Sequence, residues 1–385
     1  MPLNEMPDAG YSGLEDEATI ARRELFGRAA KIAGGGIALG AMPNLFNLLS
    51  PGLALGAGAA KDKKIAVIEQ AFGTFFTANF NKPLDQYLKK SQPGWSATFG
   101  NENNTVTTGI NLLNQYAAAN YGILMLSTGD QMSAWQQAVS KVVKGGSIFI
   151  NHSTQAVTGA TQNVLFSHKQ AGIDLGNAAV AWAKKNNVTD PVVGMLGNLS
   201  DAQGRKRTDW AWKTLKAKIP NSKLAGQAQG IDQPSGAKAS ANLLSAHPDI
   251  NMLLTFNTLG GLSALTSATH AGKNNRDQFF LGTADSEEAT LKLIAAQKSI
   301  YQANWGAFFP ASMVMMARDG IAKMNGKAIR PTRMIYGLTI TTPEQANSFG
   351  KITFDPLNPK YAYVFTKYFK YLDVKAVTGK VPAGA

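Results

Sequence analysis

Side chains that could bind a small molecule stand just after several predicted strands of this 385-residue sequence. Arg207 offers N–H donors in a fixed fork, and Asp285 is an acceptor that could also neutralise that cation. The amide of Asn257 both donates and accepts hydrogen bonds. Structural uses stay open, because Asp285 and Glu288 have capping-box spacing and Asn257 could be a turn residue. These three residue types predict a site that binds its ligand through hydrogen bonds.

The motifs of several large enzyme classes do not occur in the sequence. It contains no Gly-x-Ser-x-Gly, no Gly-x-x-x-x-Gly-Lys and no His-Glu-x-x-His run. Cysteine is absent, which excludes disulfides, thiolate metal sites and a cysteine nucleophile. His168, His247 and His270 are too far apart for a metal-binding pattern. We therefore expect no catalytic residues, no cofactor and no metal.

The elements that must position these side chains alternate between strands and helices. Strands are predicted at Lys64–Glu69, Trp95–Phe99, Gly122–Ser127, Ser147–Asn151, Pro191–Leu196, Lys223–Ala228, Met252–Phe256, Gln278–Gly282 and Ser299–Ala303. Helices are predicted at Phe75–Lys89, Val106–Ala119, Gln131–Lys141, Ala171–Lys185, Gly204–Lys218, Ser235–Ala246, Leu259–Ala271, Glu287–Ala296 and Ala307–Ala322. This alternation is typical of βαβ units, and the apolar run Ile123–Leu126 indicates a sheet covered on both faces.

The alternation pauses at 155–166, where a loop rich in Thr, Gln and Gly and an extra strand intervene, and a second series begins at Pro191. We therefore predict an α/β fold of two doubly wound lobes. Ligands of such sheets bind beyond the carboxyl ends of the strands. The residues there are Gln70–Phe76, Ser127–Asp130, Asn151–His152, Asn198–Arg207, Asn257–Gly260, Asp285 and Asn304–Trp305.

Composition agrees with two folded lobes. The chain is 44% hydrophobic, which is enough for buried cores and excludes global disorder. The net charge of +13 would favour nucleic acid or an anionic membrane if it were clustered, but the charges are spread along the chain. We therefore expect no nucleic-acid partner.

The first 59 residues have the features of an export signal. An Arg22-Arg23 pair precedes a weakly apolar run at 32–49, and the small residues Ala57-Gly58-Ala59 suit a cleavage site. The apolar run is too short and too interrupted to span a membrane. We interpret 1–59 as a twin-arginine-type signal peptide that directs the chain to the periplasm. A surface helix retained on the protein is the alternative.

Five stretches near the predicted strand ends carry a family resemblance. They are Lys64–Ile68 followed by Phe75-Phe76, Gly122–Leu126 leading to Asp130, Arg205–Arg207, Asn242–Ile250 with Asn257 closing the next strand, and Gly282–Asp285. With them, the chain from about Lys63 to Thr341 resembles the type I periplasmic sugar-binding proteins of ABC transporters, of the ribose-binding kind. The Asn-Leu-Leu-Ser-Ala-His-Pro-Asp-Ile run at 242–250 is the most specific of the five.

The resemblance implies two lobes joined by three crossovers, which close as a hinge over one ligand. The N-terminal lobe would comprise 61–167 plus 306–338, and the C-terminal lobe 168–305 plus 339–385 with an extended tail. The implied protein is a monomer that captures a sugar, a polyol or a related small molecule and delivers it to an ABC transporter permease.

The resemblance also implies the residues of the site. Phe75 and Phe76 would pack against the apolar C–H face of a sugar, while Arg207, Asn257 and Asp285 would bind its hydroxyl groups. The alternative for the phenylalanines is ordinary packing of a helix on a sheet. The alternative for Arg207 is a solvated basic surface shared with its neighbours.

Two positions depart from the ribose-binding pattern. Asn151-His152 stands where that kind carries Asp-Arg, and Trp305 stands where it carries Gln. The site loses a charge pair and gains an aromatic surface. A neutral ligand with a larger apolar face, a modified sugar or a polyol, is therefore favoured over ribose. His152 could instead be a hydrogen-bonded loop residue.

Other functions fit this fold class. A transcription regulator would carry a helix-turn-helix at its N-terminus, where this chain has the export-like segment. An enzyme on the same fold would need a nucleophile or base with a partner, and none stands out. A ligand-sensing protein that docks on a signalling receptor stays open, because transport and sensing share one binding step.

Overall fold

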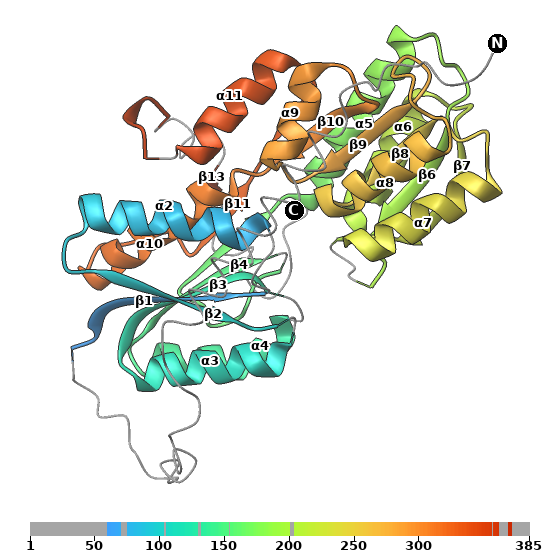
Figure 1. Ribbon diagram of the computed structural model, residues 1–385. Helices are drawn as coiled ribbons and strands as arrows, with labels where there is room; N and C mark the ends of the chain where they lie inside the picture. Colours follow the sequence, from blue (N-terminus) through green and yellow to red (C-terminus); the bar gives the residue numbers. More distant parts are fainter. Residues whose placement is uncertain are drawn as a thin grey trace, which may run out of the picture. The chain divides into compact units, whose positions relative to one another are not determined.

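The computed structural model describes residues 60–70, 75–103, 105–129, 132–153, 155–200, 204–355, 357–361 and 369–371. Within them the chain forms two mostly parallel sheets, each with helices packed on it (Figure 1). The prediction of two doubly wound α/β lobes is therefore confirmed. The signal-like segment 1–59, Asp130 and the end of the tail lie outside the described residues.

Seven strands form the sheet of the first lobe, in the order β13-β11-β5-β4-β3-β1-β2. Their bounds are β1 (Asp62–Glu69), β2 (Ser96–Asn101), β3 (Tyr121–Gly129), β4 (Ile148–Ser153), β5 (Gln162–Phe166), β11 (Thr332–Ile335) and β13 (Phe369–Tyr371). All pairs are parallel except β11 with β13. The parallel register places Glu69 opposite Ser127, and Ser127 opposite His152. The carboxyl ends of β1, β3 and β4 therefore meet at one edge.

Helices cover both faces of this first sheet. They are α2 (Phe75–Ser91) and α10 (Phe309–Met324) on one face, and α3 (Val106–Ala118) and α4 (Met132–Lys144) on the other (Figure 1). Successive strand residues point to opposite faces, so Met125 packs with the α2 and α10 side while Leu124 packs with Trp135 of α4. Both faces of β3 are buried, as the unbroken apolar run predicted.

Six strands form the sheet of the second lobe, in the order β12-β10-β9-β8-β6-β7. Their bounds are β6 (Val192–Gly197), β7 (Lys223–Gln229), β8 (Met252–Thr255), β9 (Phe280–Ala284), β10 (Tyr301–Gly306) and β12 (Leu338–Ile340), and only β12 is antiparallel. The helices are α5 (His168–Lys185), α6 (Arg205–Lys218), α7 (Gln233–Ala246), α8 (Thr258–His270), α9 (Glu288–Ala296) and α11 (Pro343–Phe354). Leu175 of α5 and Ala211 of α6 pack with Met195 on one face, and Leu244 of α7 packs on the other.

Two glycines let α5 and α6 pack unusually close together. A Cβ on Gly172 would lie 2.5 Å from the carbonyl oxygen of Arg207, and one on Gly176 would lie 2.6 Å from that of Ala211. A larger side chain at either position would push the two helices apart. The absence of a Cβ therefore brings the first turn of α6, which carries Arg207, against the first turns of α5.

The chain passes between the two sheets more often than expected. It changes sheet between β5 and β6, between β10 and β11, and between β11 and β12. After α11, which packs on α9 of the second lobe, it changes sheet again, because β13 pairs with β11 in the first. Assigning all of 339–385 to the C-terminal lobe is therefore wrong for Phe369–Tyr371. The open backbone edge of β11 provides the hydrogen bonds that draw β13 to the first lobe.

None of the helices in the described part of the chain combines the length and the apolar character that a membrane crossing needs.

Candidate functional site

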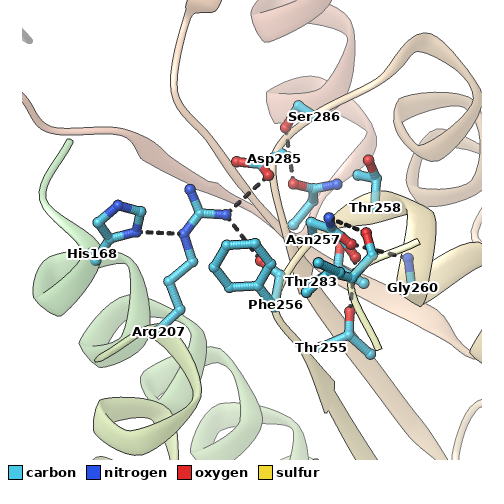
Figure 2. Close-up of polar contacts among 12 residues, drawn as sticks. His168, Arg207, Thr255, Phe256, Asn257, Thr258, Gly260, Thr283, Asp285 and Ser286 are labelled. Atoms are coloured by element: carbon cyan, nitrogen blue, oxygen red, sulfur yellow. Dashed lines mark hydrogen bonds and ion pairs between the residues drawn. The ribbon is translucent and has the colours of Figure 1, made fainter. Parts of the chain in front are cut away.

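Arg207 is the centre of a buried polar cluster in the second lobe (Figure 2). Its Nη1 donates to Oδ2 of Asp285 at 2.9 Å and to the carbonyl of Phe256 at 2.9 Å, and its Nε donates to Nδ1 of His168 at 2.8 Å. The guanidinium also lies 4.5 Å from the centre of the Phe256 ring. Residue 207 is 4% exposed, so the alternative of a solvated basic surface is wrong for Arg207. The guanidinium is held by partners from three separate elements.

Asp285 directly follows β9 and takes an unusual backbone conformation. Its φ is +65°, a region where aspartate is among the few tolerated side chains. Oδ2 pairs with Arg207, whereas Oδ1 has no hydrogen-bond partner among the described residues. Burial raises the pKa of this carboxyl, and the guanidinium of Arg207 opposes that rise. One acceptor atom of a 5% exposed carboxyl is therefore unused.

The alternative of Asp285 as a helix cap is wrong. The N-cap of α9 is Glu287, whose backbone N–H donates to Thr290 Oγ1 at 3.1 Å. Glu287 also accepts a 2.6 Å hydrogen bond from Thr258 of α8, and burial raises the pKa of its carboxyl. A capping box does exist at this helix, but it is formed by Glu287 and Thr290 and so begins two residues after Asp285.

Asn257 has a structural use, but as the N-cap of α8 and not as the turn residue that the sequence suggested. Its Oδ1 accepts from the N–H of Gly260 at 3.0 Å and caps α8, and its Nδ2 donates to the carbonyl of Ile231 at 2.7 Å. Both ends of the amide are therefore engaged within the chain. A ligand contact at Asn257 stays a prediction.

Trp305 is fully buried in β10. A Cβ at Gly337, in the link between β11 and β12, would lie 2.4 Å from Cε2 of this indole. Glycine is therefore required where the chain passes the ring. Asp174 of α5 lies near this indole; burial raises the pKa of its carboxyl, while the hydrogen bond from Gln170 lowers it. Trp305 thus packs among α5, β10 and the β11–β12 link, with its ring 6.0 Å from the Arg207 guanidinium.

The neighbours Asn151 and His152 point to opposite faces of the first sheet. The Nδ2 of Asn151 donates to the Gln155 carbonyl at 2.8 Å and to Asn163 Oδ1 at 2.9 Å, which holds the loop after β4. The His152 ring makes edge contacts with Phe166 and Phe309, and burial lowers its pKa to about 3. His152 is therefore a neutral ring in an aromatic surrounding.

Phe75 and Phe76 are the first two residues of α2, as predicted for the mouth of the first helix. Their side chains lie outside the described part of the structure, and their role as a sugar-packing pair stays a prediction.

One polar residue of the first lobe was not singled out from the sequence. Glu69 is the last residue of β1, and neither of its carboxylate oxygens has a hydrogen-bond partner among the described residues. It shares a sheet face with Ser127 and His152, since each of the three lies two positions beyond a strand residue that packs on the α2 and α10 side. Burial raises the pKa of Glu69 to about 8. The sequence did contain a signal for Glu69, because it is an acidic residue that ends an apolar strand. It lies one position before Gln70–Phe76, the range considered at the end of that strand.

His168 was also missed as a site residue. In the sequence, the histidines were tested only for the spacing of metal ligands. Within the described ranges, no three or more His, Asp or Glu side chains are grouped so that they could hold a metal ion. His168 begins α5, two residues after β5 ends. The position of His168 just after β5 was the available signal. It was missed because the sequence predicted an extra strand within 155–166 without saying where that strand ends.

Two mostly parallel sheets, each covered by helices and with buried polar side chains near the carboxyl ends of its strands, place the chain in the doubly wound α/β class. A model of the periplasmic binding protein domain matches residues 65–320. The chain therefore belongs to the periplasmic binding protein domain family, and the resemblance to type I periplasmic binding proteins is confirmed.

Solved structures of ABC transporter solute-binding proteins have the same fold. One from Actinobacillus succinogenes 130z with bound D-allose has 15% identity and a TM-score of 0.65, covering 74% of this chain and 99% of that chain. One from Bacillus halodurans C-125 with bound myo-inositol has 19% identity and a TM-score of 0.64, covering 76% and 98%. A Mycobacterium smegmatis protein in complex with β-D-fucofuranose has 13% identity and a TM-score of 0.67, covering 80% and 99%. Comparison with curated proteins gave no match.

Proposed function

We propose that this protein captures a sugar, a polyol or a related small molecule between its two lobes and delivers it to an ABC transporter permease in the periplasm. Family membership supports the binding of a solute. The related folds hold D-allose, myo-inositol and β-D-fucofuranose, which are all polyhydroxylated and uncharged.

The observation that carries the proposal is the unused part of the Arg207–Asp285 pair. Nη2 of Arg207 donates to no described residue, and Oδ1 of Asp285 accepts from none. A hydroxyl group both donates and accepts, so adjacent hydroxyls can bind this donor and this acceptor together. Because the two charges already neutralise one another, the pair suits a ligand without net charge. We infer binding rather than catalysis, since the carboxylate is held by Arg207.

A thermal-shift screen tests this function directly. Pentoses, hexoses, polyols and nucleosides, with D-allose and myo-inositol among them, would be added to the chain without residues 1–59. We expect at least one sugar or polyol to raise the melting temperature, because a ligand that binds only the folded state stabilises it by mass action. At a concentration one hundred times the dissociation constant, the gain is about 2.7 kcal/mol. A screen in which only nucleosides or no compounds stabilise the protein contradicts the proposal.

We further propose that residues 1–59 direct the folded chain to the periplasm by a twin-arginine route. The Arg22-Arg23 pair and the Ala57–Ala59 cleavage site support it. Changing both arginines to lysine is expected to leave unprocessed protein in the cytoplasm, as measured by fractionation and immunoblotting. Changing Arg28 and Lys31 to glutamine is the matched control and should leave processing unaffected. Periplasmic delivery of the variant with both arginines replaced would contradict this route.

A further inference from the structure

His168 and Asp285 hold Arg207 from different sides (Figure 2). His168 is 2% exposed, and its Nδ1 lies 2.8 Å from the Nε of Arg207. Arginine has donors and no acceptor, so this contact requires an unprotonated Nδ1. The neutral ring then carries its proton on Nε2, which has no hydrogen-bond partner among the described residues. The geometry fixes both the charge and the tautomer of His168.

The contacts of Arg207 also fix which donors remain. The guanidinium has five N–H groups in one plane. The N–H on Nε goes to His168, and Nη1 serves both the Phe256 carbonyl and Asp285. Two N–H groups on Nη2 remain, and their direction is set once Nε and Nη1 are held. Without the bond at Nε, the guanidinium would be hydrogen-bonded only through Nη1 and could pivot about that nitrogen.

We propose that neutral His168 is a positioning residue for ligand binding, whose Nδ1 orients Arg207 so that its Nη2 donors meet an oxygen of a bound sugar or polyol. This proposal rests on the proposed function, because it assumes that Arg207 binds the ligand. Protonation of His168 replaces the acceptor by a donor and puts two cations in contact, which disrupts the orientation.

The surroundings of His168 favour the neutral ring. Burial, followed by the positive charges of Arg207 and Lys206, lowers its pKa well below the usual value. The Phe166 ring lies 6.2 Å away and offers no charge. The ionisable side chains around the pair are Lys206 and Arg207 from α6, Asp285 after β9, Lys169 and Asp174 from α5 itself, and His152 beyond Phe166.

The first test needs no ligand. Nitrogen-15 NMR of the histidine rings in the unliganded protein should show His168 neutral at about pH 7, with its proton on Nε2. Exposed His270 serves as the reference in the same spectrum. A proton on Nδ1, or a charged ring, would overturn the positioning role. This result is independent of the ligand screen, so the failure of one proposal can be told from the failure of the other.

The second test uses two substitutions with opposite hydrogen-bonding ability. The Oδ1 of asparagine can replace the Nδ1 acceptor, whereas leucine fills space without accepting. With the sugar or polyol that gives the largest thermal shift as probe, His168→Leu should weaken binding by about tenfold or more. His168→Asn should bind within about threefold of the wild-type affinity. It should also lack the loss of affinity that protonation of His168 causes in the wild type at acid pH. His270→Leu is the control for an added leucine.

Three outcomes of the second test would overturn the proposal. They are normal affinity in a folded His168→Leu variant, no rescue by asparagine, and an acid-induced loss of affinity that persists in His168→Asn. If His168→Leu does not fold, the proposal is decided by two measurements. They are the affinities of the wild type and of His168→Asn across pH, and the tautomer of His168 from the NMR spectrum.

Discussion

Replacing Asp285 by asparagine is expected to weaken binding of the best sugar or polyol from the screen by about thirtyfold or more. Removing one partner of a buried, hydrogen-bonded charge pair costs about 2–5 kcal/mol, because the other charge is left unpaired, and about 1.4 kcal/mol is a factor of ten. Asparagine tolerates the left-handed backbone at φ +65°, whereas alanine would add strain there. Isothermal titration calorimetry would measure the change.

The same substitution should also destabilise the fold by about 3–5 kcal/mol, because Arg207 stays buried. Affinity must therefore be measured at a temperature where the variant is fully folded by circular dichroism. Asp249→Asn, at an exposed position of the same lobe, is the matched control and should change neither quantity. A folded Asp285→Asn variant with the affinity of the wild type would remove Asp285 from the ligand site.

Replacing Glu69 by glutamine is expected to stabilise the protein in alkaline solution. The Glu69 carboxyl is fully buried, and burial raises its pKa to about 8. The unfolded chain has the ordinary value of about 4.3, so the folded state holds the proton more tightly. The favourable contribution of the protonated carboxyl is present below about pH 4 and is lost as pH rises towards about 8. At about 1.4 kcal/mol per pKa unit, the loss is about 4–5 kcal/mol.

Glutamine has no charge to gain, so Glu69→Gln should avoid this loss. Its free energy of unfolding should exceed that of the wild type by several kcal/mol at about pH 9, and by about 1 kcal/mol or less at about pH 5. Urea unfolding at the two pH values measures both differences. Glu288→Gln, at an exposed position, should show no such growth with pH. Equal differences at both pH values would mean that Glu69 is ionised in the folded protein.

Strand and helix positions could be predicted because they depend on neighbours along the chain. The apolar run at Ile123–Leu126 specified a strand buried on both faces, and the structure places β3 there. The tail could not be predicted in the same way. Phe369–Tyr371 joins the first sheet because an edge of β11 is open, and nothing in three residues of local sequence specifies that partner.

Two of the polar site residues were predicted as a pair, since an arginine that stays charged needs an acidic neighbour. Arg207 and Asp285 do form an ion pair at 2.9 Å. The separate uses of the other residues could not be predicted. Asn151 and His152 differ because their strand turns them to opposite faces, and Asn257 is engaged by the carbonyl of Ile231.

The sequence by itself determined the order of elements, the α/β class and the side-chain types at the strand ends, because each depends on local pattern and chemistry. Only the tertiary structure decided which of those side chains meet. His168 and Arg207 are 39 residues apart and come into contact because Gly172 and Gly176 admit the backbone of α6. The tautomer of His168 and the raised pKa of Glu69 depend likewise on burial, which is a property of the packed lobes and not of any short segment.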